Sequence, residues 1–481
     1  MFFFSLIRTF ELKLEGRLHL GKLKKTSISL VFRSVCTTFA KRFDEMEQLL
    51  HYVWKHKMLP VSPLETTDGR RVELIDPGLH NRNAGPDFFN AKLRISDTLW
   101  VGNVEIHERS SDWYQHGHDS DPRYDNVVLH VVEQADREVQ NSRGDYLPQL
   151  VLPVPQAVTD NYRELLATDQ YPPCYKIIPS LTRLMVHSWM AALQTERLEQ
   201  KTEAISRRAE QCNGSWEDAY FVTLARNYGF GINGEAFELW ARNLPLHAVD
   251  KHRDDLFQIE AIFMGQAGLL CLESIPERHQ ADALNDGYFA KLRNEYLYLA
   301  HKFSMKPIDF TIWRFLRLRP QNFPHIRISQ LANLYYNRRA GLSQLLECQT
   351  ISELHELFQT HVTPYWETHY GFGSLTPDKV SIRKNMSVSS KNLLIINTAI
   401  PMLFAVGRHR QKEELCDRAF DLLEQLKAEK NHIITMWQEC GLDVKTAGDS
   451  QALIQLKKEY CDRKDCLRCR IGYEYLKRVK S

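Results

Sequence analysis

The stretch from Asn83 to Val132 is unusually rich in side chains that can bind a metal ion or transfer a proton. Short apolar runs separate these side chains, which are Asp87, Glu105, His107, Asp112, His116, His118, Asp125 and His130. Carboxylates suit hard cations such as Mg²⁺, whereas imidazoles bind softer divalent metals and exchange protons near neutral pH. The stretch therefore predicts a site for metal-dependent or acid–base chemistry.

Strand geometry indicates which of these residues lie on the same face of the sheet. Residues 98–107 are predicted to form a strand whose alternation places Glu105 and His107 on one face, and Asp87 precedes a second strand at 88–95. Carboxylates on adjacent strands can hold a divalent cation that polarises a phosphate and activates water. We therefore predict Asp87 and Glu105 as ligands of Mg²⁺ or Mn²⁺. With His107 positioning or deprotonating the water, all three are the predicted catalytic residues.

Two other interpretations of this stretch stay open. In the first, Asp87 caps a turn, and Glu105 and His107 lie on a solvated strand face. In the second, His116 and His118 form part of a zinc or iron site of a metallohydrolase. Those two histidines could otherwise join Ser111 and Asp112 as a second shell of the first site, or be solvated at a helix C-terminus. His130, inside an apolar strand, is predicted to be buried and structural.

The elements predicted to position these residues occur in a recognisable order. A helix over residues 47–58 precedes strands at 71–76, 88–95 and 98–107. A short helix that begins after Ser111 and runs through His118 precedes a strand at 126–132. This order, with Asp87 before the second strand and Glu105 near the end of the third, resembles the PD-(D/E)XK nuclease superfamily. The resemblance implies a restriction-endonuclease-like fold and a metal-dependent phosphodiesterase. His107 stands where the superfamily pattern has a lysine.

Helical patterns, one of them over residues 308–318, dominate the chain after Pro173, which gives an α+β fold class overall. We expect a restriction-endonuclease-like head, a mixed sheet flanked by helices, followed by a large all-helical C-terminal body. The predicted domains are an α+β domain at 46–170, a helical domain at 171–435 and a cysteine-containing segment at 436–481. Residues 1–45 are predicted to be a disordered tail or translated upstream sequence, because a well-formed helix starts just after Met46.

Several longer motifs resemble one particular family. NAGPDFFNAKL, NYGFGINGEAFE, WRFLRLRPQNFPHIRISQLA and YCDRKDCLRCRIG are similar to sequences of the uncharacterised bacterial "domain of unknown function 2851" proteins. The resemblance extends from about Met46 to Lys477. It implies no established activity.

A cluster of arginines follows Trp313 in the predicted helical domain. Guanidinium groups match phosphate geometry, and the neighbouring Phe315, Phe323 and His325 could stack on bases, which predicts contact with DNA or RNA. The alternative is that these arginines pair between helices. They are Arg314, Arg317, Arg319 and Arg327.

Four cysteines lie close together near the C-terminus. Their thiolates could hold a structural Zn²⁺ or an iron–sulfur cluster, and the alternative is four thiols in a polar tail. The predicted ligands are Cys440, Cys461, Cys466 and Cys469.

Composition limits the function classes. The chain has 62 basic and 60 acidic residues and a formal net charge of +2, so contact with nucleic acid requires a local basic patch. Mean hydropathy is −0.40, and no apolar run reaches the roughly 18 residues of a membrane span, so we expect no membrane helix. The remaining cysteines are scattered, which favours a reducing, cytoplasmic compartment. The oligomeric state is left open.

Overall fold

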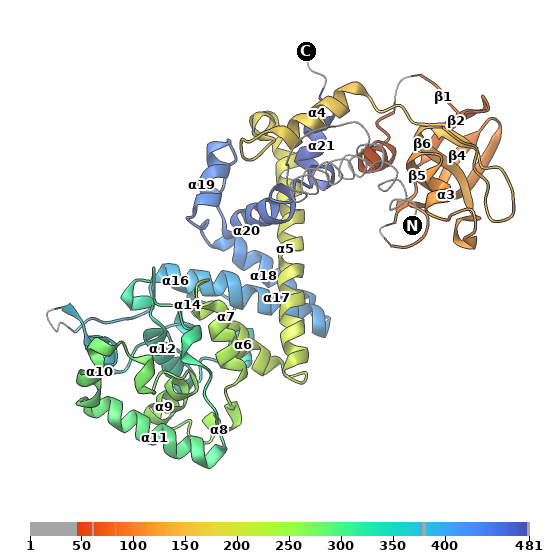
Figure 1. Ribbon diagram of the computed structural model, residues 1–481. Helices are drawn as coiled ribbons and strands as arrows, with labels where there is room; N and C mark the ends of the chain where they lie inside the picture. The colour runs from red at the N-terminus through yellow and green to blue at the C-terminus, as the bar shows by residue number, and fades with distance from the viewer. Residues whose placement is uncertain (1–45, 60–61, 82, 378–380, 479–481) are drawn as a thin grey trace, which may run out of the picture. The chain divides into compact units, whose positions relative to one another are not determined.

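The computed structural model describes residues 46–59, 62–81, 83–377 and 381–478 (Figure 1). The chain forms two compact units. Unit 1 is the chain up to Ile177 together with the chain from Lys464 onwards, and unit 2 is Ile178–Arg463. The C-terminal segment predicted from residue 436 is therefore shared between the units. The prediction for residues 1–45 lies outside the described residues.

A mixed sheet forms the centre of unit 1, in the order β1-β2-β4-β5-β6-β7. The first four strands are antiparallel, whereas β6 and β7 continue in parallel from β5, and β3 pairs with β4. Thr66, next to β1, bridges to Leu150 of β7, so the sheet is nearly closed. The strands are β1 (Leu64–Glu65), β2 (Arg71–Asp76), β3 (Leu79–His80), β4 (Phe88–Ile95), β5 (Thr98–Arg109), β6 (Val127–Gln134) and β7 (Gln149–Val151).

Strand β4 shows why this sheet forms from this sequence. Leu93 and Ile95 point into the core, while Lys92 and Arg94 alternate with them in solvent. The register shifts between Phe88 and Ala91, where Asn90 has a positive φ of 55°. This bulge lies just after Asp87, and such bulges redirect a strand next to a site.

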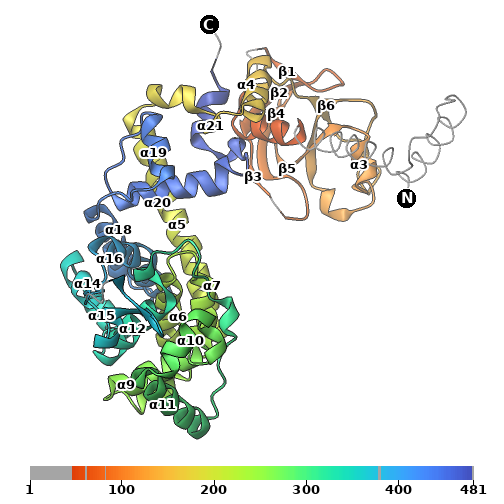
Figure 2. The ribbon, with the colours of Figure 1, turned by 60° about the vertical axis from the view of Figure 1, so that its left-hand side comes forward.

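The crossover from β5 to β6 carries the short helix α3 (Asp112–Gln115) and the turn η1 (Pro122–Tyr124) (Figure 2). The predicted helix through His118 is wrong, because α3 ends at Gln115 and Gly117 turns the chain with φ +74°. The Ser111 hydroxyl donates to Asp136 Oδ2 at 2.8 Å, and Asp112 Oδ2 accepts from the Arg109 N–H at 3.0 Å. Both residues therefore anchor the crossover and contact no predicted site residue through these bonds.

Among the described residues, three further α-helices belong to unit 1. One covers residues 46–55, and the others are α4 (Gln156–Ala167) and α21 (Arg470–Leu476). Trp54 of the first is fully buried, and its Nε1 donates to the Pro77 carbonyl at 3.2 Å. Asn161 of α4 donates to the Leu476 carbonyl at 3.2 Å, which fastens the C-terminal helix to unit 1.

Unit 2 is largely helical and surrounds one extensive apolar core. Its helices are α5 (Arg183–Gln211), α6 (Trp216–Tyr228), α7 (Gly234–Arg242), α8 (Leu246–Asp250), α9 (Leu256–Gln266), α10 (Glu277–Leu284), α11 (Gly287–Phe303), α12 (Pro324–Tyr336), α13 (Leu342–Glu347), α14 (Ile351–Leu357), α15 (Pro364–Thr368), α16 (Val388–Leu394), α17 (Ile400–Arg410), α18 (Glu413–Gln425), α19 (His432–Glu439) and α20 (Ala447–Gln455). Two π-helical segments, η7 (Ile395–Ala399) and η8 (Leu456–Cys461), interrupt them.

Two predictions for this unit are wrong. The unit is not all-helical, because β8 (His369–Gly371) and β9 (Ser374–Leu375) form a hairpin. The helix predicted over 308–318 is absent from that described stretch, which contains only the turn η4 (Phe310–Ile312). Asn233 bonds to the Arg314 N–H and carbonyl, each at 2.8 Å, and these tertiary bonds replace helical ones.

One helix among the described residues, Val388–Arg410, is long and apolar enough to cross a membrane. Its most apolar window is 78% buried inside the protein. A core helix has this same length and composition, so the segment is weak support for a membrane span.

Candidate metal centre

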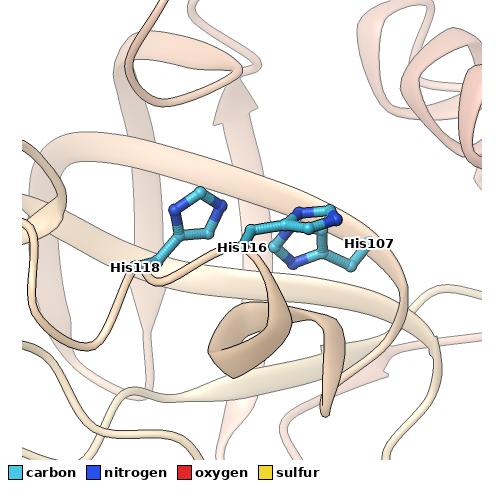
Figure 3. Close-up of side chains that lie close together, drawn as sticks. All are labelled: His107, His116 and His118. Atoms are coloured by element: carbon cyan, nitrogen blue, oxygen red, sulfur yellow. The ribbon is translucent and has the colours of Figure 1, made fainter. Parts of the chain in front are cut away.

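Three histidines converge beside β5 (Figure 3). His107 comes from the strand, and His116 and His118 come from the turn that follows α3. One nitrogen from each lies within 4.8 Å of the other two, and His107 Nε2 is 3.1 Å from His116 Nδ1. Within the part of the chain that the structure describes, this is the one group of three or more possible ligands that close together.

Buried aromatic rings hold the turn in place. Trp113 of α3 is fully buried, and its Nε1 donates to the Gln140 carbonyl at 2.9 Å. The Tyr124 ring stacks on His118 with a centroid distance of 3.8 Å. His107 and His118 are buried whereas His116 is exposed, so the group is open to solvent on the His116 side.

Glu105 flanks the histidines. Its Oε1 lies 3.2 Å from His118 Nε2 and 3.6 Å from His107 Nε2. Its Oε2 accepts the Asp87 N–H at 3.0 Å, and Asp87 Oδ2 accepts the Ile106 N–H at 2.9 Å in return. This reciprocal pair fixes the direction of the Glu105 carboxyl. The structure thus brings the three predicted catalytic residues together, with Asp87 behind Glu105.

Asp87 also faces away from the histidines. Its Oδ2 lies 3.4 Å from His51 Nε2, on the helix over residues 46–55. Burial lowers the pKa of His51, but the hydrogen bond and charge of Asp87 outweigh burial, and the net pKa is raised. Asp87 therefore has partners of its own, the Ile106 N–H and the His51 ring.

The spacing of His107 and His116 suits two ligands of one ion. Two nitrogens bound to a tetrahedral Zn²⁺ at about 2.0–2.1 Å are roughly 3.3–3.4 Å apart, close to the 3.1 Å between His107 and His116. Three protein ligands with one remaining position is the ligand count of catalytic zinc sites. Imidazole donors also suit zinc, copper, iron or nickel better than Mg²⁺.

Burial sets the protonation of the group. Burial lowers the pKa of His107 well below its ordinary value, and the neighbouring imidazoles lower it further. Burial also lowers the pKa values of His116 and His118, and brings that of His130 to about 3. These rings are neutral near pH 7, and neutral imidazole is the form that binds a metal. Burial and the charge of Asp87 raise the pKa of Glu105 to about 9.

This raised pKa predicts a pH dependence for the ion-free protein. A group whose pKa is higher in the folded state stabilises that state most below its unfolded value, near 4.5. Glu105 is therefore expected to lower the free energy of unfolding as pH rises from about 4.5 to about 9. Urea denaturation of native protein and of Glu105→Gln, each with chelator present and at several pH values, measures the free energy of unfolding of both. The difference in free energy of unfolding between native protein and Glu105→Gln is expected to change between about pH 4.5 and about pH 9. A difference that stays constant over this range would contradict the raised pKa of Glu105.

The predicted arginine cluster is not a single exposed surface. Arg327 is buried, and its guanidinium donates to Gln330 Oε1 at 2.9 Å and Asn322 Oδ1 at 2.6 Å. It also lies 4.4 Å from the Phe230 ring centroid. The prediction that Arg327 binds nucleic acid is therefore wrong, because its side chain is buried inside unit 2 and both of its terminal nitrogens donate to side chains there. Its neighbours Arg314, Arg317 and Arg319 are exposed, and their contact with nucleic acid stays a prediction.

The four predicted cysteine ligands are divided between the units. Cys440 and Cys461 belong to unit 2, whereas Cys466 and Cys469 belong to unit 1. No cysteines form a group of three or more close ligands across the described ranges. Burial, with the nearby Cys469, raises the pKa of Cys466 to about 12, which disfavours its metal-binding thiolate in the absence of an ion. A zinc ion or iron–sulfur cluster at these cysteines stays a prediction.

The family described as "Protein of unknown function (DUF2851)" matches residues 47–432 of this sequence. The chain belongs to the DUF2851 family. The match includes the three histidines, Glu105 and most of unit 2, and it begins next to Met46, where the predicted resemblance begins. No curated protein and no solved structure matches this DUF2851 chain.

Proposed function

We propose that this DUF2851 protein is a metal-dependent hydrolase whose ion is bound by His107, His116 and His118. The observation that carries the proposal is the convergence of three neutral imidazoles from two separate elements, with a carboxyl group beside them. When bound, such an ion supplies Lewis acidity and lowers the pKa of a coordinated water to about 7.

The residues around the histidines have distinct roles in this proposal. The charge of a bound ion would lower the pKa of Glu105 from its ion-free value of about 9, so the carboxyl would be ionised. It would then accept the proton of the attacking water, because its Oε1 lies beside His107 and His118. Asp87 directs that carboxyl through its backbone N–H. Substrate approaches on the side of His116, the exposed member of the group.

A second candidate is a nuclease of the PD-(D/E)XK type with a restriction-endonuclease-like head. The observation favouring it is the strand order: an antiparallel meander β2-β4-β5, then β6 parallel to β5, with Asp87 and Glu105 in contact. In this version Asp87 and Glu105 hold Mg²⁺ or Mn²⁺ and the substrate is DNA or RNA. The histidine-based hydrolase accounts for more of the observed contacts, since His116 and His118 bind no ion in the nuclease version.

Metal content and turnover of the native full-length protein test the proposal. Mass spectrometry of the bound metal should find a transition metal. The protein should hydrolyse at least one of four test substrates, namely bis(p-nitrophenyl) phosphate, a p-nitrophenyl ester, DNA or RNA. This hydrolysis should require the bound metal and should stop when a chelator removes it. The proposal fails if no metal binds or if His116→Ala keeps full turnover.

Two variants separate the candidates. The nuclease predicts that Asp87→Asn abolishes Mg²⁺-dependent cleavage while His116→Ala spares it, and the histidine-based hydrolase predicts the greater loss for His116→Ala. Salt-dependent binding of nucleic acid without turnover would instead favour a non-catalytic scaffold.

A further inference from the structure

His130 lies directly behind His107. It sits on β6, fully buried, where the parallel register places it opposite Glu105. His130 Nε2 is 2.9 Å from His107 Nδ1, and the Trp113 ring lies 5.2 Å away by centroids. The other nitrogen, His130 Nδ1, has no hydrogen-bond partner among the described residues.

We propose that His130 is a positioning residue that selects the tautomer of His107 able to bind the ion. The inference rests on the proposed metal centre and deepens it. A neutral imidazole carries one N–H and one lone pair. His107 Nε2 faces His116 Nδ1, whereas Nδ1 of His107 faces His130. Nε2 therefore needs its lone pair to bind an ion, and the proton must then sit on Nδ1. That Nδ1–H donates to His130 Nε2, which fixes both the tautomer and the ring orientation.

In this arrangement the proton of neutral His130 lies on Nδ1, the buried atom that has no hydrogen-bond partner among the described residues. A residue at position 130 that offers an acceptor would preserve this hydrogen bond between His107 and position 130, and a residue with no polar atom would leave His107 Nδ1–H unpaired.

Two substitutions at position 130 test this role in the full-length chain. His130→Gln supplies an amide oxygen as acceptor near the position of Nε2, whereas His130→Leu supplies none. Loss of an outer partner of a metal-binding histidine typically weakens metal binding by about 10- to 100-fold. We expect that loss of Co²⁺ and Zn²⁺ affinity for His130→Leu, and affinity near the native value for His130→Gln.

The matched control is His325→Leu in unit 2. His325 is also a buried histidine whose Nδ1 has no partner within the described ranges. His325→Leu therefore has the same general cost of replacing a buried imidazole as His130→Leu, but away from the proposed metal centre. We expect His325→Leu to leave metal affinity unchanged.

A spectroscopic readout distinguishes positioning from general loss of structure. In ¹⁵N-histidine-labelled native protein with zinc bound, His107 should carry its proton on Nδ1, and zinc-bound His130→Gln should keep that tautomer. If native protein binds metal and His130→Leu binds it equally well, the role of His130 is overturned while the metal centre stands. If native protein binds no metal, both are overturned.

Discussion

His107→Ala is expected to abolish metal binding and any metal-dependent hydrolysis. His107 is the central one of the three proposed ligands, because its Nε2 lies 3.1 Å from His116 Nδ1 and 3.6 Å from Glu105 Oε1. Loss of an outer partner alone weakens metal binding by about 10- to 100-fold, so loss of a ligand should exceed about 100-fold. Competition titration with a chromophoric chelator measures the change.

Thermal unfolding provides a second measurement of the same prediction. A metal that binds only the folded chain stabilises it by about 2.7 kcal/mol at a free concentration 100 times the Kd. Native protein should gain this stability with zinc, and His107→Ala should gain none. His116→Ala is the control for folding, because His116 is exposed and its loss leaves the core intact. A zinc-dependent rise in the melting temperature of either variant equal to that of native protein would contradict the assigned ligands.

Much of the framework around this centre is predictable from local sequence. Two predicted strands have the observed bounds, Arg71–Asp76 and Phe88–Ile95, because apolar and polar residues alternate along them. Strand parity also places Glu105 and His107 together correctly, since that alternation needs no knowledge of the partner strands.

The convergence of the histidines depends on information that the sequence does not carry locally. His116 and His118 reach His107 only because Gly117 ends α3 early and the buried Trp113 fixes the crossover. His130 is predicted to be buried, and it is, but its contact with His107 depends on the parallel register of β5 and β6. Register between strands separated by a long crossover is a tertiary property, so spacing alone does not reveal it.

Tertiary contacts also explain the wrong predictions in unit 2. Arg327 looks like one of four phosphate-binding arginines, yet it is the one that Asn322, Gln330 and Phe230 enclose. The apolar spacing of 308–318 suits a helix, but bonds from Asn233 hold that backbone in another conformation. In both cases a partner distant in sequence decides the outcome.

Glu105→Gln is expected to abolish hydrolysis while preserving metal binding. The amide keeps the size of the carboxyl and can still accept the Asp87 N–H through its oxygen, but it cannot take a proton from water. General-base catalysis typically contributes about 10²- to 10⁴-fold, so turnover should fall within that range. Metal affinity should change much less than in His107→Ala, because the three imidazoles remain.

The pattern across three variants makes this assignment of Glu105 specific. His107→Ala should lose both turnover and metal content, whereas Glu105→Gln should lose turnover alone. Asp87→Asn should lose a smaller part of turnover, because its contact with His51 weakens but the backbone N–H that holds Glu105 remains. Raising the pH cannot restore Glu105→Gln, since the amide does not ionise, which separates loss of the base from a mere shift in its pKa. If Glu105→Gln loses its metal together with its turnover, Glu105 is a ligand and the base must be another group. If it keeps full turnover with metal bound, Glu105 has no part in proton transfer, and the reciprocal bonds between Glu105 and Asp87 serve only to join β4 and β5.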